Sequence, residues 1–296
     1  MNSIDIESKK FLGQPKNFVS IFNALLFDGK QVLKPEYLKD ENSELVMNVS
    51  SKHVDIIKRY EDGTYLDLFV IESQSYVDPS MVARVMEYEC VARMRYIRQN
   101  FKKHVPMHTR LPMILTVVLY VGESKWNAAK RLSELEIIHP GFEDMFNEFK
   151  LNLIELNTNH KYNTGEKATQ DFFDLLRMIY RKQILKEDLD REFNRDALYF
   201  AYVVTKNKEL LNIYQESEKG DVKVCRALDE MFEESTNKGI QMGIKQGIEQ
   251  GVERGVKNTQ IKIAIKMLVR NNQTLEEISE IVGLDLDALR ELKKSI

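Results

Sequence analysis

The stretch that decides the fold is VDIIKRYEDGTYLDLFVIESQ, which runs from Val54 to Gln74. Two short apolar runs flank the dipeptide Asp62-Gly63, a strong short-range signal for a β-hairpin. Acidic groups nevertheless stand in these runs, where a core strand is expected to be apolar. A buried carboxylate is costly unless a cation pairs with it, and a divalent metal ion is one such partner. The stretch therefore predicts both a sheet and a candidate metal site.

The register of this hairpin decides which side chains share a face. If Asp62-Gly63 is a two-residue turn, Asp55 lies opposite Val70, and Glu72 and Gln74 project from the same face. Glu72 is then the diagonal neighbour of Asp55, about 7–8 Å away along the backbone. A three-residue loop would reverse the parity and separate the two acids. The predicted site therefore depends on the turn.

The predicted chemistry is that of a metal-dependent hydrolase. Two converging carboxylates, Asp55 and Glu72, can hold one Mg²⁺ or Mn²⁺, which binds a phosphodiester oxygen and lowers the pKa of a water molecule. Gln74 can orient that water or the substrate through its amide, but it has no basic group near neutral pH. Asp67 is expected on the opposite face in a structural role. The alternative is a solvated sheet edge with ordinary surface carboxylates.

The bulk composition is that of an ordinary soluble globular chain. The 296 residues are 43% hydrophobic and 30% charged, with a formal net charge of −3. This length accommodates one large domain with an appendage, or two domains. Cys90 and Cys225 lie far apart without CxxC spacing, which argues against a zinc ribbon or a disulfide framework. Neither a signal-peptide pattern nor a run of about 20 apolar residues is present, so the expected location is the cytoplasm.

Periodicity and turn signals predict a mixed α/β layer. We expect helices at residues 17–27, from Asp78-Pro79 towards Phe101, at 172–185 and at 197–204. We expect strands around 45–47, at 54–60, 65–74, 111–120 and 151–156. Residues 111–120 (LPMILTVVLY) are nearly all apolar, as in a strand that is buried on both faces.

A glycine repeat changes the character of the chain near residue 236. Glycine recurs at every fourth position, and each glycine is followed by isoleucine or valine: Gly239, Gly243, Gly247, Gly251 and Gly255. A period of four is close to a helical turn, so glycines and aliphatic residues would form neighbouring stripes. Two interpretations stay open: a flexible, partly helical connector, or a helix that associates with another helix and makes a homo-oligomer. The boundaries are expected at 1–235, 236–258 and 259–296.

The tail, residues 274–296, predicts two short helices. Thr274 and Glu277 have capping-box spacing, Gly283 can end the first helix, and Asp285 can cap the second. With residues 261–268 this makes a small bundle similar to a helix-turn-helix. Its basic residues, Arg290, Lys293 and Lys294, could meet phosphate, but three cations are few for specific DNA binding. A packing cap with a solvated basic end is the alternative.

A second basic group falls on the helix that follows the hairpin. Four cations lie within about 60° of each other at the helical period: Arg84, Arg95, Arg98 and Lys102. They are candidate DNA contacts, although a charged stripe is commonly only a solvent-exposed face.

The order of these segments is similar to that of a known family. VDIIKRY, DLFVIESQ, MVARVMEYECVARM and PMILTVVLYVGESKW together resemble the Rpn family of recombination-promoting nucleases, within the PD-(D/E)XK superfamily. The resemblance covers roughly residues 15–180 and 236–296. The Val121-Gly122 step and Trp126 resemble the family's V-L-Y-x-G-x-x-x-W segment.

The resemblance implies a restriction-endonuclease-like αβββαβ core and Mg²⁺-dependent DNA cleavage linked to recombination or mobile elements. By position, Asp55 corresponds to the first acid and Glu72 to the second. Gln74 occupies the place that lysine holds in the superfamily's E-x-K. Without that lysine, water activation would depend more on the metal ion. The alternative is a catalytically degenerate DNA-binding or oligomerisation protein.

Overall fold

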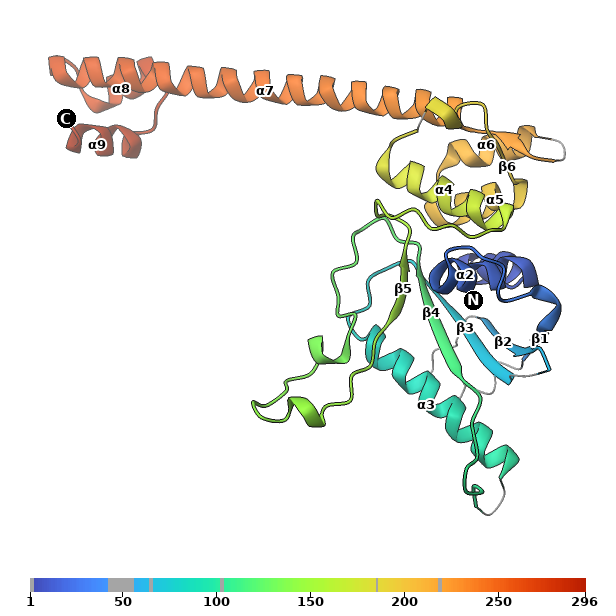
Figure 1. Cartoon of the computed structure of the whole chain (residues 1–296). Helices are drawn as coiled ribbons and strands as arrows, with labels where there is room; N and C mark the ends of the chain where they lie inside the picture. Colours follow the sequence, from blue (N-terminus) through green and yellow to red (C-terminus); the bar gives the residue numbers. More distant parts are fainter. Residues whose placement is uncertain (1–2, 42–55, 64–65, 102–103, 185, 218–219) are drawn as a thin grey trace. The chain divides into compact units, whose positions relative to one another are not determined.

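The structure is a computed structural model that describes residues 3–41, 56–63, 66–101, 104–184, 186–217 and 220–296. The chain divides into two compact units, Met1–Asp229 and Glu230–Ile296. The first unit is a mixed α/β structure and the second is helical (Figure 1). The predicted strand around residues 45–47 and the residue Asp55 lie outside the described residues.

A five-stranded mixed sheet forms the centre of the first unit. Its strands follow the chain order: β1 (Leu38–Asp40), β2 (Ile56–Glu61), β3 (Leu66–Gln74), β4 (Ile114–Tyr120) and β5 (Asn152–Glu155). The pairs β1–β2 and β2–β3 are antiparallel, whereas β3–β4 and β4–β5 are parallel. Strand β3 is therefore a central strand with antiparallel and parallel neighbours, and β4 is almost entirely buried, as its apolar sequence predicts.

The hairpin register differs from the predicted one by two residues. Ile57, not Asp55, pairs with Val70, and Glu61 pairs with Leu66 across a four-residue connection. A two-residue type I′ turn needs positive φ at both central residues. Of the two predicted turn residues only Gly63 has it, with a φ of 89°. Because the shift is even, it preserves the parity on which the predicted face depends.

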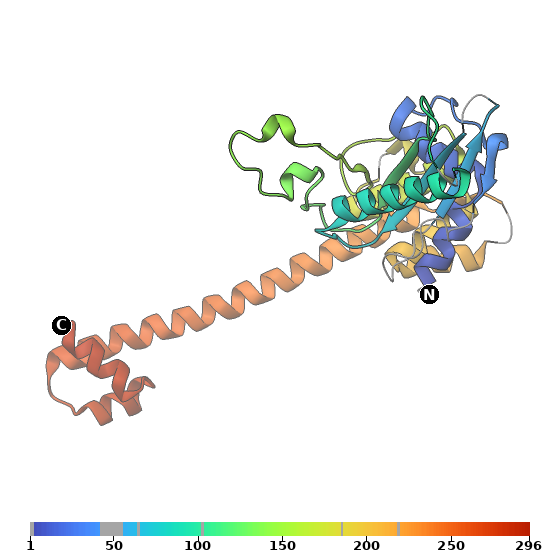
Figure 2. The same ribbon diagram turned by 90° about the horizontal axis from the view of Figure 1, so that it is seen from below.

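Helices cover both faces of the sheet (Figures 1 and 2). Helix α3 (Met81–Asn100) covers one face, where Tyr88 and Ala92 join Ile57 and Val70 in a buried cluster. Helix α2 (Pro15–Phe27) covers the other face, where the Phe22 ring lies 4.8 Å from the Phe69 ring. Helix α1 (Ser3–Leu12) precedes it.

Helix α3 begins at Met81, two to three residues later than the Asp78-Pro79 start that the sequence predicts. Ser80 is the N-cap residue, and the Asp78 carboxylate accepts hydrogen bonds from its backbone N–H and its hydroxyl. Asp78 therefore organises the turn before the helix, and its second carboxylate oxygen is left for another donor.

A helical group completes the first unit. It contains α4 (Lys167–Arg181), α5 (Arg195–Thr205), α6 (Lys208–Glu216) and a small hairpin of β6 (Glu192–Phe193) and β7 (Val222–Lys223). The described ranges also contain the 3-10 turns η1 (Pro35–Tyr37), η3 (Leu132–Glu134), η4 (Glu143–Met145) and η5 (Lys186–Asp188). Tyr180 of α4 donates a hydrogen bond to the Val121 carbonyl and so ties this group to the end of β4.

The glycine repeat is helical throughout. It lies inside α7 (Cys225–Arg270), a continuous helix of 46 residues that begins just before the boundary between the units. The aliphatic residues that follow the glycines are 52–61% exposed: Ile240, Ile244, Ile248, Val252 and Val256. The helix therefore forms although no described residue buries this aliphatic stripe.

The predicted tail bundle is present. Helix α8 (Leu275–Val282) begins with the Thr274–Glu277 capping box and ends at Gly283, whose φ is 74°. Helix α9 (Leu286–Lys294) follows the Asp285 cap. Both pack on the end of α7 around a small core: Ala264, Leu268, Ile278, Val282 and Leu289. No helix in the described part of the chain is long and apolar enough to cross a membrane.

Candidate active site

Glu72 and Gln74 lie two residues apart at the C-terminal end of β3 and project from one face of the sheet. Both are buried, with exposed fractions of 2% and 6%. The amide Nε2 of Gln74 donates a 2.8 Å hydrogen bond to Oε1 of Glu72. Among the described residues, the buried Oε1 of Gln74 has no hydrogen-bond partner. An oxygen ligand is therefore presented beside a buried carboxylate.

The parallel strands explain why these polar groups lie where they do. Gln74 is in register with Tyr120 of β4, and Tyr120 is in register with Glu155 of β5. These residues form one row at the carboxyl ends of three parallel strands, the edge at which open α/β sheets bind ligands. Burial, together with the charge of Glu155, raises the pKa of Tyr120. Lys130 pairs with Glu155 in turn.

Arg84 supplies the positive charge at this site. From the first turn of α3, its guanidinium lies 3.0 Å from Oε1 of Glu72 and 2.5 Å from Oδ2 of Asp78. It also donates hydrogen bonds of 2.8 and 3.1 Å to the Tyr88 hydroxyl. The Arg84 side chain is 13% exposed. Arg84 thus links two acids and a tyrosine. It compensates the negative charge of Glu72, for which the sequence predicts only a metal ion as the cationic partner.

The pKa shifts follow from this bridge. Burial alone would raise the pKa of Asp78, but hydrogen bonds from Ser80 and Arg84 outweigh it and lower that pKa. Burial would lower the pKa of Arg84, yet its bonds to Tyr88 and Asp78 and the charge of Glu72 raise it. Burial raises the pKa of Tyr88. All three shifts favour a charged ion-pair network beside a neutral phenol.

The other predicted site residues are placed as follows. Asp67 lies on the face opposite Glu72, as the parity of the register predicts. Arg84 points into the ion-pair network, not to solvent, because Glu72 and Asp78 hold it. Arg95 is half-buried and Arg98 is exposed on the same helix. Asp55 and Lys102 lie outside the described residues, so their roles stay predictions.

The residues present have the right chemistry for a hard divalent cation. Mg²⁺ and Mn²⁺ take oxygen ligands, and the Glu72 carboxylate and the Gln74 amide oxygen are both of this kind. Within the described ranges, no group of three or more His, Cys, Asp or Glu side chains could hold a metal ion. A complete ligand set therefore needs a further residue, and Asp55 is the acid that the sequence predicts for it.

Comparison with known families identifies the chain. A family model described as "Putative transposase, YhgA-like" matches residues 9–210. The chain belongs to this family. The predicted resemblance is thereby confirmed, since this is the Rpn, PD-(D/E)XK-type family. The match includes the sheet, α3 and α4, and ends before the glycine repeat. No curated protein and no solved structure matches the chain.

Membership of this family indicates a function associated with mobile elements. The geometry also includes residues that the sequence does not predict for the site. Asp78 is predicted only as a helix start and Arg84 only as a DNA contact, and no role is predicted for Tyr88. The spacing does contain a signal, because Arg84 stands four residues before Tyr88 and the two therefore share one face of a helix.

Proposed function

We propose that the chain is a Mg²⁺- or Mn²⁺-dependent DNA endonuclease that hydrolyses phosphodiesters in recombination or at mobile elements. The observation that carries this proposal is the buried pair of Glu72 and Gln74 at the end of β3, whose amide oxygen has no hydrogen-bond partner among the described residues. The element order α2-β1-β2-β3-α3-β4 supports it, because it is the αβββαβ order of a restriction-endonuclease-like core. Family membership supports it independently.

The proposed roles follow from the chemistry of each residue. Asp55 and Glu72 are the proposed metal ligands, with the Gln74 oxygen as a third donor. When bound, such an ion neutralises phosphate charge and lowers the pKa of a coordinated water. Gln74 is neutral, so it orients groups and does not remove a proton. Arg84 positions the Glu72 carboxylate through the 3.0 Å contact.

Arg84 also supplies a cation that can act in place of the absent lysine. The superfamily pattern places a lysine two residues after the second acid, where this chain has Gln74. Here a cation reaches the second acid from α3 instead, since the Arg84 guanidinium bonds Oε1 of Glu72. We therefore assign to Arg84 the electrostatic part of the lysine's role. Proton transfer is excluded from that role, because arginine stays protonated in proteins.

Cleavage of supercoiled plasmid DNA tests the proposal. The wild-type chain is expected to nick or linearise the plasmid with Mg²⁺ and to leave it intact with EDTA. Asp55→Ala and Glu72→Gln should each reduce cleavage to background. Asp67→Asn is the matched control, because Asp67 lies on the same strand but on the opposite face. Circular dichroism and thermal unfolding must show that each variant is folded. Full cleavage by a folded Asp55→Ala or Glu72→Gln variant would refute the assignment.

The second candidate function is a degenerate nuclease that binds DNA or oligomerises without cleaving. Two observations favour it: Gln74 replaces a basic residue, and Glu72 already has Arg84 as a cationic partner. This protein would shift DNA in a gel equally with Mg²⁺ and with EDTA, and would never cleave it. Gel-shift and cleavage assays on one preparation separate the two functions.

A further inference from the structure

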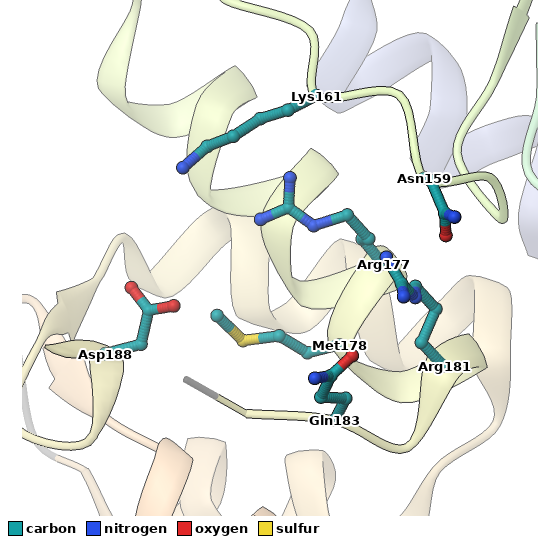
Figure 3. A pocket seen from close by; sticks show the side chains of 7 residues that line it. All are labelled: Asn159, Lys161, Arg177, Met178, Arg181, Gln183 and Asp188. Carbon is teal, nitrogen blue, oxygen red and sulfur yellow. The ribbon is translucent and has the colours of Figure 1, made fainter. Parts of the chain in front are cut away.

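A pocket of about 190 Å³ lies beside the C-terminal half of α4, and neither Glu72 nor Gln74 is among the residues that line it (Figure 3). Three cationic side chains line it: Arg177 and Arg181 from α4, and Lys161 from the loop after β5. Asn159 and Gln183 add amide groups. The pocket thus gathers hydrogen-bond donors from three segments of the chain.

Two acids in the described part of the chain pair with arginines at or beside the pocket. Asp188, which lines the pocket, lies 3.6 Å from Arg191. Asp174 receives 2.8 Å and 2.9 Å contacts from Arg191 and from the pocket residue Arg177. The Arg177 side chain is only 15% exposed, so this pairing fixes it in the pocket wall. These two acids therefore orient the pocket wall, and neither of them pairs with the remaining cations of the pocket.

These remaining cations are Lys161 and Arg181. Both are exposed, and neither forms an ion pair with any residue in the described part of the chain. The helix dipole accounts for a cation in the last turn of α4, as at Arg181. It does not account for Lys161, which comes from a different segment. Two cations beside one pocket, neither with an ion pair to a described residue, mark a site for an anion on a chain whose overall charge is −3.

The chemistry favours a phosphate group. Guanidinium and ammonium groups beside amide donors offer several hydrogen bonds from different directions, which match the oxygens of a phosphate. The position favours a phosphate of a nucleic acid strand over free phosphate. Tyr180 of α4 bonds the Val121 carbonyl, and the Val121 N–H bonds the Gln74 carbonyl at 2.8 Å. Two hydrogen bonds thus connect the pocket helix to the strand end that carries the proposed catalytic pair.

We propose that the pocket of Lys161, Arg177 and Arg181 binds a backbone phosphate of the DNA strand, remote from the cleaved bond. This proposal rests on the proposed function for its choice of DNA, but the pocket itself does not depend on cleavage. Lys161 and Arg181 make the electrostatic contacts, while Arg177 is a fixed donor in the wall.

DNA binding measured in EDTA tests this site without any cleavage. Fluorescence anisotropy with a labelled duplex gives the affinity of the full chain at several salt concentrations. Each lost phosphate contact should reduce the slope of log K against log salt by about 0.9. At about 0.1 M salt this corresponds to a loss of affinity of up to about eightfold. Lys161→Gln and Arg181→Gln should each show this loss, and the double variant about twice the slope change. Lys16→Gln, an exposed lysine on α2, is the control.

A second measurement distinguishes the sources of phosphate. Thermal unfolding with inorganic phosphate, compared with chloride at equal ionic strength, reports whether free phosphate stabilises the pocket. Loss of the DNA slope in the variants, with the control unchanged, supports the proposal whether or not the chain cleaves DNA. An unchanged DNA slope with a lost phosphate effect makes the pocket a free-phosphate site and overturns the DNA assignment. An unchanged slope and unchanged unfolding overturn the site.

Discussion

Replacing Arg84 by methionine tests the central ion-pair network. The substitution keeps a long side chain on α3 but removes a cation that is bonded to Glu72, which is 2% exposed. Loss of one partner from a buried ion pair costs about 3–5 kcal/mol. Asp78 retains its bonds from Ser80 and Glu72 retains its bond from Gln74, so we expect the lower end, about 3 kcal/mol.

The assay is urea unfolding followed by circular dichroism, with Arg98→Met as the control. Arg98 is an exposed cation on the same helix, and its loss should change stability by no more than about 0.5 kcal/mol. In the double variant Arg84→Met/Glu72→Gln no uncompensated carboxylate remains at Glu72, so part of the loss should be recovered. We expect a coupling of about 1.5–3 kcal/mol between the two positions. A loss below about 1 kcal/mol for Arg84→Met, or simple additivity, would refute the reasoning.

The same variant reports on metal binding. If Glu72 is a metal ligand, Mg²⁺ can replace the lost positive charge, and a ligand that binds only the folded state raises its stability. Mg²⁺ should therefore raise the melting temperature of Arg84→Met more than that of the wild type. The gain should vanish when Glu72→Gln is added. An equal Mg²⁺ effect on all three proteins would argue against a metal ion at Glu72.

Three further predictions concern other parts of the chain. Because the folded-state pKa of Asp78 is lowered, its contribution to stability is present above its unfolded pKa of about 3.9 and is lost as the pH falls through the folded value; Asp78→Asn should flatten the acid limb of a plot of the urea midpoint against pH. Gly122→Ala should cost about 1–3 kcal/mol in thermal unfolding, because a Cβ there would lie 2.5 Å from the Tyr120 hydroxyl; a neutral effect would contradict this packing. The exposed aliphatic stripe of α7 should make the chain self-associate, and Val252→Lys should shift the mass in multi-angle light scattering towards the monomer; a wild-type monomer at high concentration would contradict it.

Much of the fold follows from local sequence signals. The apolar run at 111–120 predicts a strand buried on both faces, and β4 is one. The capping box at Thr274 and the glycine at Gly283 delimit α8 as expected. In each case either the interaction that determines the element joins residues a few positions apart, or all residues of the segment are buried alike. Such signals are visible without tertiary structure.

The sequence predicts the structure incorrectly where the result depends on contacts between residues that are far apart in the chain. The turn at Asp62-Gly63 predicts a two-residue loop, but the strands pair with a four-residue connection. Strand pairing is decided by packing against α3 as well as by the turn, and an even shift keeps Val70 and Glu72 on the packed face. The parity, and with it the predicted side of Glu72 and Gln74, is therefore more robust than the register itself.

The glycine repeat shows a different limit. In a helix interior each of the five glycines would cost about 1 kcal/mol relative to alanine. For this reason the sequence also permits the interpretation of a flexible connector. The segment is nevertheless helical in α7. Because a Cβ at each of these glycines would meet no atom within 4 Å, nothing in the described part of the chain requires their small size. Close approach of another helix would require it, and this is why self-association is the experiment for this segment.

The candidate site joins these points. In the proposed assignment Gln74 stands where the superfamily has a lysine, and from that alone the site would lack a cation. The cation comes from Arg84, twelve residues from Glu72, and only the packing of α3 on the sheet brings the two together. A cation absent from one position of a strand can thus be supplied by a neighbouring helix, and no local sequence signal links Arg84 to Glu72. It follows that Gln74 alone does not decide whether the site is active, and that activity should be tested at Arg84 as well as at the two acids.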